Sequence, residues 1–304
     1  MRFSFWPAPS NPWSETLSAC QHAERVGFDG VWFSDHFMPF QGSVDGPIHE
    51  CWTALAGLAA AVPRVRVGSI VTGNTYRHPA VLAKQAATVD HISGGRCVLG
   101  LGAGWQENEH LAYGIEYDTV KGRLDRLDEA CAVITSLLRR ERTTFDGEHY
   151  RLRDAPLSPK PVHPRLPLLI GGGGEKRTLR IAAHWADEWN IWGEPALMAA
   201  KGAVLARHCE SIGRDPAEIA HSAVALLFLS DDEAFLSKMR QRDHGRATII
   251  GTSAQVVEIV HAYAAAGVDE LIIPDFTMPD PARKRETLQQ FMSEVAAPVS
   301  GARP

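Results

Sequence analysis

An aspartate and a histidine stand side by side as Asp35-His36, directly after the apolar run Gly30–Ser34. Imidazole titrates near neutral pH, and a neighbouring carboxylate can orient its ring and raise its basicity. The pair could therefore donate and accept a proton as a general acid and base. A histidine at the end of a strand can also be purely structural, and the pair alone does not decide between these interpretations.

Glycines gather in two clusters, Gly100-Leu101-Gly102-Ala103-Gly104 and Gly171–Gly174. Glycine lets the backbone approach a ligand closely, and a glycine run that opens a helix offers its N–H groups to an anion. Gly171–Gly174 therefore fits a phosphate site, although a tight turn is an alternative interpretation. The first cluster lacks the Gly-x-Gly-x-x-Gly spacing of a nicotinamide-binding Rossmann motif.

Other catalytic signatures are missing from the sequence. The 13 histidines form no His-x-x-x-His or His-Glu-x-x-His set, so no metal site is expected. There is no Gly-x-Ser-x-Gly elbow and no Walker-type loop with its lysine, which argues against acyl and phosphoryl transfer.

Composition narrows the partners and the compartment. Lysine and arginine number 31 against 36 aspartates and glutamates, a net charge of −5, and no block of like charge suggests binding to nucleic acid or to an anionic membrane. The 5 cysteines form no Cys-x-x-Cys pair, which indicates reduced, mostly buried thiols of a cytosolic protein. Neither a signal peptide nor an apolar run of about 20 residues is present. We expect a cytoplasmic protein that binds a small molecule and could form a homodimer.

The residues named so far need elements to position them. Short apolar runs alternate with segments of helical period, such as Pro79–Ile92, Lys121–Arg140 and Ser253–Ala266, which predicts repeated βα units. Eight units favour an α/β fold, a single (β/α)8 TIM barrel over residues 1–304, with an open doubly wound sheet as the alternative. Insertions are expected near residues 141–167 and 230–252. The predicted strands are Arg2–Trp6, Gly30–Ser34, Val65–Ile70, Arg96–Gly100, Leu168–Ile170, Glu188–Ile191, Ala220–Leu229 and Glu270–Ile273.

The chemical residues follow these strands. In a parallel barrel the active site lies at the carboxyl ends of the strands. Asp35-His36 and both glycine clusters each come just after a predicted strand, so they should share one end of the barrel. Trp6, Trp105 and Trp192 fall at or just beyond strand ends as well. Their rings could wall a pocket for a flat ligand, although ordinary packing is the alternative.

Five motifs in this order resemble the luciferase-like monooxygenase superfamily and, more narrowly, the coenzyme F420-dependent oxidoreductases of actinobacteria. The similarity runs from Met1 to about Phe291. The motifs are Phe28–Phe37, Arg77–Ala80, Ile92–Arg96, Leu99–Trp105, and Arg177–Leu179 with Ala186–Asn190.

The resemblance implies a deazaflavin lying across the carboxyl end of the barrel. It exchanges a hydride while the protein supplies orientation and a proton. His36 would be the proton donor or acceptor, with Asp35 orienting its ring beside the cofactor. The family also has a non-proline cis peptide behind the cofactor ring, for which Ser69-Ile70 is the matching pair. The further cofactor residues implied are Thr72, Gly102, Ala103, Gly104, Trp105, Asn108, Gly171, Gly172 and Gly173.

Two departures bear on the substrate. The sugar-phosphate dehydrogenases of this family have a glutamate where this chain has Trp105, and a lysine in the loop that here reads Ile191–Glu194. A phosphorylated sugar is therefore not expected. Trp6, Phe40 and Trp192 suggest a flatter, largely apolar or aromatic substrate, whereas Glu107 and Glu109 could be polar contacts or solvated helix residues.

Three functions remain open at this point. The first is an F420-dependent reductase or dehydrogenase. The second is an FMN-dependent monooxygenase on the same barrel, and the third is a flavin- or deazaflavin-binding protein without catalysis.

Overall fold

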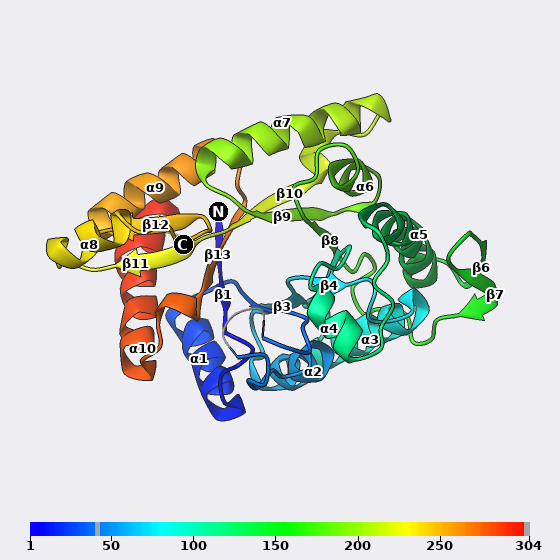
Figure 1. Ribbon diagram of the computed structural model, residues 1–304, viewed down its shortest axis with the longest axis horizontal. Coiled ribbons are helices and arrows are strands. Elements are labelled where there is room, and N and C mark those ends of the chain that lie inside the picture. The colour runs from blue at the N-terminus through cyan, green and yellow to red at the C-terminus, as the bar shows by residue number, and fades with distance from the viewer. Residues whose placement is uncertain (40–42, 301–304) are drawn as a thin grey trace.

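Eight parallel strands form a closed barrel in the computed structural model, which describes residues 1–39 and 43–300 (Figure 1). Neighbours pair in the order β3-β2-β1-β13-β10-β9-β8-β5, and pairing between β3 and β5 closes the ring. This is the predicted α/β barrel and not the open sheet. The strands are β1 (Arg2–Trp6), β2 (Gly30–Phe33), β3 (Arg66–Ser69), β5 (Cys97–Gly102), β8 (Leu168–Gly171), β9 (Glu188–Trp192), β10 (Ala220–Val224) and β13 (Glu270–Pro274).

Helices surround the barrel, and those with clear signals begin and end within one residue of the predicted positions. In α9 (Ser253–Ala265), Thr252 and Gln255 form a capping box. In α3 (Pro79–Ser93), proline opens the helix and Gly94 ends it at φ 68°. The others are α1 (Trp13–Val26), α2 (Cys51–Ala61), α4 (Glu107–Ala112), α5 (Val120–Arg139), α6 (Thr178–Trp185), α7 (Pro195–Ser211), α8 (Glu233–Arg240), α10 (Pro281–Gln290) and α11 (Ala297–Ser300).

Both predicted insertions carry structure of their own. The first holds an antiparallel hairpin of β6 (Arg142–Asp146) and β7 (Arg151–Pro156), which lies outside the barrel in Figure 1. The second holds α8 and β12 (Thr248–Gly251). Neither contributes a strand to the closed ring.

The predicted strand Ala220–Leu229 is wrong as a single element. β10 stays in the barrel to Val224, whereas β11 (Leu226–Leu229) leaves it and pairs in parallel with β12. The change of partner explains the break. The Ala225 N–H still donates to the Ile272 carbonyl at 3.3 Å, but the Leu226 N–H donates to Ala247 at 2.9 Å. A continuous apolar run therefore hides a switch from one sheet to another.

Buried charges fill the amino end of the barrel. Glu270, which is fully buried, accepts hydrogen bonds from Ser4 Oγ at 2.6 Å, Trp32 Nε1 at 2.8 Å, Arg66 Nη1 at 2.8 Å and Arg2 Nε at 3.0 Å. Burial alone would raise the pKa of Glu270, but the two arginines and the two neutral donors lower it below its ordinary value. This end is thereby filled with paired side chains, which leaves the carboxyl end for a ligand.

Two further findings concern the chain as a whole. All five cysteines are free and buried, as the sequence predicts, and burial raises the pKa of the Cys51 thiol. Within the described residues, no helix is both long and apolar enough to cross a membrane.

Candidate active site

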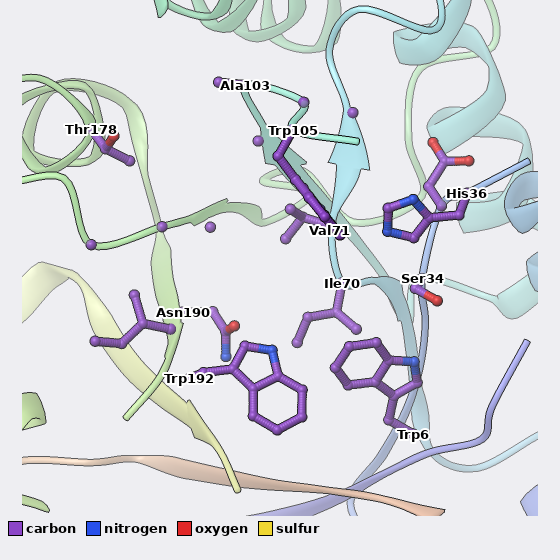
Figure 2. Close-up of a pocket in the computed structure, with 18 of the residues that line it drawn as sticks. Trp6, Ser34, His36, Ile70, Val71, Ala103, Trp105, Thr178, Asn190 and Trp192 are labelled. Carbon is purple, nitrogen blue, oxygen red and sulfur yellow. The ribbon is translucent and has the colours of Figure 1, made fainter. Parts of the chain in front are cut away.

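A cavity of about 610 Å³ opens at the carboxyl ends of the barrel strands. Figure 2 shows His36 and Trp105 on one side of it and Trp6 and Trp192 on another, with Ile70 and Val71 between them. The structure thus brings most of the predicted residues to one place. Those that line the cavity are Trp6, Asp35, His36, Ile70, Gly102, Ala103, Gly104, Trp105, Gly171, Gly172, Gly173 and Trp192.

Three predicted residues in the described part of the chain do not line it. Ser69 is buried, and its hydroxyl donates to the Gly100 carbonyl at 2.9 Å. Thr72 is buried too, and its hydroxyl accepts from Trp52 Nε1 at 3.0 Å. Asn108 is exposed on α4, and Phe40 lies outside the described residues. Ser69 and Thr72 therefore support the cavity wall from behind.

The non-proline cis peptide bond lies one residue later than predicted, at Ile70-Val71 instead of Ser69-Ile70. The backbone hydrogen bonds between neighbouring strands explain the difference. Ile70 N–H still donates to the Phe33 carbonyl at 2.8 Å, so the chain follows β2 up to that residue. Pairing resumes at β4 (Thr72–Gly73), which lies against β5. Ile70 and Val71 thus form the bulge that faces the cavity.

The barrel glycines make room for this bulge. A Cβ on Gly171 would lie 2.9 Å from both γ-carbons of Val71, and one on Gly102 would lie 2.8 Å from Val71 Cγ2. A Cβ on Gly100 would lie 2.0 Å from the Ser69 carbonyl oxygen. Such contacts are closer than packed atoms allow. These glycines therefore allow two segments of the chain to pack closely together, in addition to any close approach of the backbone to a ligand.

The second glycine cluster lies along the rim of the cavity. Gly172 has φ 120°, a conformation that favours glycine, and its N–H donates to the Asn190 carbonyl at 2.9 Å. That N–H is therefore not available to an anion. α6 begins four residues after the cluster at Thr178, which also lines the cavity.

Glu109, and not Asp35, holds the His36 ring. His36 Nδ1 lies 2.8 Å from Glu109 Oε1, and Glu109 Oε2 accepts the Phe37 N–H at 2.6 Å and the Met38 N–H at 3.0 Å. Tyr76 also donates to this carboxylate. Burial alone would raise the pKa of Glu109, but these hydrogen bonds, chiefly those from His36 and Tyr76, lower it. Glu109 is fully buried, so its interpretation as a solvated helix residue is wrong.

Asp35 has a different partner. Its two oxygens accept from Arg77 Nη1 at 2.5 Å and Arg77 Nη2 at 3.1 Å, and Arg77 also contacts Glu50, the residue that caps α2. Burial raises the pKa of Asp35, although Arg77 opposes the shift. The carboxylate therefore ties the end of β2 to α2. Orientation of the His36 ring, which the sequence assigns to Asp35, belongs to Glu109.

An aromatic wall faces His36 across the cavity. The ring centres of Trp6 lie 5.8 Å from Trp192 and 5.1 Å from Phe276. The guanidinium of Arg246 lies over Trp192, 4.5 Å from its ring centre, in a cation–π contact. Near His36 itself, Trp105 presents its ring at 5.5 Å and is 57% exposed. The cavity thus suits a flat, largely apolar ligand.

Several polar lining residues are not predicted from the sequence. Asn190 had a usable signal, because residues two apart on a strand share a face and Trp192 is predicted to line the site. Arg246 had none, since it lies in an insertion without helical or strand periodicity. The polar residues concerned are Ser34, Tyr76, Thr178, Asn190, Lys201 and Arg246. Among the described residues, no group of three or more histidine, cysteine or acidic side chains could hold a metal ion.

The chain is thus a closed (β/α)8 barrel whose cavity at the carboxyl end is lined by a bulge, an aromatic wall and His36, which pairs with Glu109. A model of the luciferase-like monooxygenase family matches residues 1–242. The chain belongs to this family.

Relatives within the family include F420-dependent enzymes. The chain is 40% identical over 221 residues to an F420-dependent glucose-6-phosphate dehydrogenase of Kineococcus radiotolerans, covering 70% of this chain and 63% of the relative. It is 32% identical over 219 residues to an F420-dependent hydroxymycolic acid dehydrogenase of Mycobacterium tuberculosis, covering 72% and 60%. The match thus spans less than two thirds of the length of these curated relatives.

Solved structures support the fold. A structure of an F420-dependent secondary alcohol dehydrogenase in complex with an F420–acetone adduct superposes with a TM-score of 0.85. It covers 97% of this chain and 98% of that one at 20% identity. At this identity the likeness concerns the luciferase-like barrel alone.

Proposed function

We propose that this chain is an F420-dependent oxidoreductase that transfers a hydride between the deazaflavin and a small, largely apolar or aromatic substrate. The observation that carries the proposal is the His36–Glu109 pair at 2.8 Å, buried at the edge of a cavity with an aromatic wall. The similarity to F420-dependent dehydrogenases supports the choice of cofactor.

The residues present fit such a cofactor. Val71 offers an apolar surface beside Gly102 and Gly171, where side chains would fill the space. Gly172 and Gly173 form an open rim next to Lys201, which also pairs with Glu175 at 2.8 Å. We infer that the bulge supports the flat ring, while the glycine rim and Lys201 hold the acidic tail. When bound, the deazaflavin supplies a carbon that accepts or donates a hydride.

His36 would move the proton. Because the Glu109 carboxylate can only accept, His36 Nδ1 carries a hydrogen in this bond, and Nε2 is left as the atom that exchanges a proton. In the oxidising direction Nε2 accepts the proton of a substrate hydroxyl, and in the reducing direction it returns a proton to the carbonyl oxygen. The charge of Glu109 stabilises the protonated ring that forms during oxidation.

The cavity wall selects the substrate. Trp6, Trp192 and Phe276 present apolar ring surfaces, and Trp105 stands next to Gly104 at a position without a carboxylate. These surfaces favour a flat alcohol or ketone over a phosphorylated sugar. Substrate oxidation or reduction would then take place between this wall and His36.

Binding measurements test the proposal directly. The purified chain is titrated with F420 and, separately, with FMN, and the quenching of tryptophan fluorescence is followed. We expect micromolar affinity for F420 and no measurable affinity for FMN. The opposite result would overturn the proposal in favour of a flavin-dependent monooxygenase. The F420-loaded chain is then screened against pairs of aromatic alcohols and ketones.

A further inference from the structure

Asn190 on β9 is a buried polar residue whose amide faces in two directions. It is only 5% exposed, yet it lines the cavity. Its Nδ2 donates to the Ser222 carbonyl oxygen at 3.2 Å and to Ser222 Oγ at 2.9 Å. Ser222 therefore accepts from the nitrogen end of the amide through two oxygens.

These bonds fix which end of the amide faces the ligand. The Ser222 carbonyl can only accept, and Ser222 Oγ uses its hydrogen on the Trp189 carbonyl at 3.2 Å. If the Asn190 amide were reversed, its oxygen would face the Ser222 carbonyl oxygen and Ser222 Oγ, and neither of these has a hydrogen to donate to it. Asn190 Oδ1 must therefore point away from Ser222, and Figure 2 shows it on the side of the cavity that holds Val71. Within residues 1–39 and 43–300, nothing donates a hydrogen bond to it.

We propose that Asn190 Oδ1 is a specificity-determining acceptor that binds an N–H or O–H group of the ligand in this cavity. The inference rests on the proposed function, because it concerns the same cavity. A fixed carbonyl oxygen weakens ligand binding when the ligand covers it without donating a hydrogen bond, because the oxygen then loses its contact with water. It also repels anionic groups, so the ligand edge at this position carries a hydrogen-bond donor.

Two ligands could supply that donor. One is the imide N–H at the edge of a deazaflavin or flavin ring, and the other is a hydroxyl or amine of the substrate. Asn190 pairs in register with Gly171 of β8, the glycine that packs against Val71. The acceptor therefore lies on the strand next to the one that contacts the bulge, within the region where ring and substrate would meet.

The first experiment tests the ring as the source. Binding of 5-deazariboflavin is compared with that of its 3-methyl derivative, which lacks the imide hydrogen, and lumiflavin is compared with 3-methyllumiflavin in the same way. We expect the unmodified protein to bind the parent rings about 10- to 100-fold more tightly than the methylated rings. Asn190→Leu and Asn190→Ala should lose this preference, whereas Gln289→Leu, which removes an exposed side-chain amide from α10, should keep it.

The second experiment tests the substrate as the source. With F420 bound, 6-hydroxy-1-tetralone is compared with 1-tetralone as a binding probe. A preference for the hydroxylated probe of about tenfold that disappears in Asn190→Leu assigns the donor to the substrate. If the unmodified protein shows neither preference, or if Asn190→Leu retains one, the proposal is overturned and water alone satisfies Oδ1. The identity of the cofactor is decided by the separate titration with F420. Asn190 is tested whichever cofactor the chain binds, because one ring pair is a deazaflavin and the other is a flavin.

Discussion

His36 Nδ1 and Glu109 Oε1 lie 2.8 Å apart, although 73 positions separate them in the chain. One residue follows β2 and the other lies on α4, so the contact forms only when the barrel brings the two strand ends together. The same carboxylate accepts the N–H groups of Phe37 and Met38. Glu109 thus fixes both the ring and the loop that carries it.

Replacing Glu109 tests its role as a positioning residue. Glu109→Gln should keep F420 affinity and KM but lower kcat about 10²-fold, within the range of general acid–base contributions, because the protonated ring loses its counter-charge. The pH profile of kcat should change shape as well. Glu107→Gln, an exposed neighbour on the same helix, serves as the control. Equal kcat values for the two variants would contradict the assignment.

The proton role of His36 makes a stronger prediction. His36→Ala should bind F420 with unchanged affinity and turn over about 10²- to 10⁴-fold more slowly, which is the usual contribution of a general acid or base. His184→Ala removes an exposed imidazole from α6 and should have no effect. Steady-state kinetics on the alcohol or ketone found by screening measures both. An unchanged rate in His36→Ala would remove this residue from the mechanism.

The glycines that accommodate the bulge can be separated from those at the rim. Gly171→Ala forces a Cβ to within 2.9 Å of Val71, so it should lower stability by about 1–3 kcal/mol and weaken F420 binding. In Gly173→Ala the nearest atom, Ile191 Cγ2, lies 3.5 Å from the new Cβ, an ordinary contact. This variant should keep its melting temperature. Thermal unfolding and F420 titration of both variants measure the difference, and equal melting temperatures would contradict it.

Glu270 predicts how stability depends on pH. Its pKa in the folded chain is lowered from the ordinary value of 4.5, so its stabilisation is complete above that value and is lost as the pH falls through the folded pKa. Glu270→Gln should cost about 3–5 kcal/mol at pH 7, because it leaves buried arginines without this partner. Melting temperatures of the two proteins should converge as the pH falls below about 4.5. A constant difference between them would contradict the prediction.

Arg77 and Asp35 should behave as a coupled pair. Arg77→Met leaves the buried Asp35 carboxylate unpaired and should destabilise the chain by about 3–5 kcal/mol. Because burial raises the pKa of Asp35 and Arg77 opposes that shift, Asp35→Asn should remove the unpaired charge and restore part of the loss. Chemical unfolding of the two single variants and the double variant measures the coupling. Additive losses would show that the two residues act independently.

The sequence predicts most of the barrel because its signals are local. Proline at the start of α3, the capping box of α9 and the buried stripe of α5 each act within a few residues. β11 was not predicted as a separate strand because its apolar run continues that of β10. The two strands differ in their partners, since Leu226 of β11 pairs with Thr248 of β12. Such a long-range choice leaves no trace in local periodicity.

The site divides in the same way. Residues that follow strands, such as His36 and Trp192, could be placed from the sequence. The partner of His36 could not, because Asp35 is adjacent in sequence but points to Arg77, whereas Glu109 arrives from another βα unit. Two residues that are adjacent in the sequence are therefore not necessarily partners, because neighbouring side chains can point in opposite directions.

Arg246 lies at the cavity on the short segment between α8 and β12, and among the described strands β12 pairs with β11 alone. The barrel closes its ring of hydrogen bonds without either strand. Residues 230–252 can therefore change in length or sequence without breaking a hydrogen bond between two barrel strands. Under the proposed function, a change in this segment would alter the cavity at Arg246 while the barrel that holds the His36–Glu109 pair keeps its hydrogen bonds.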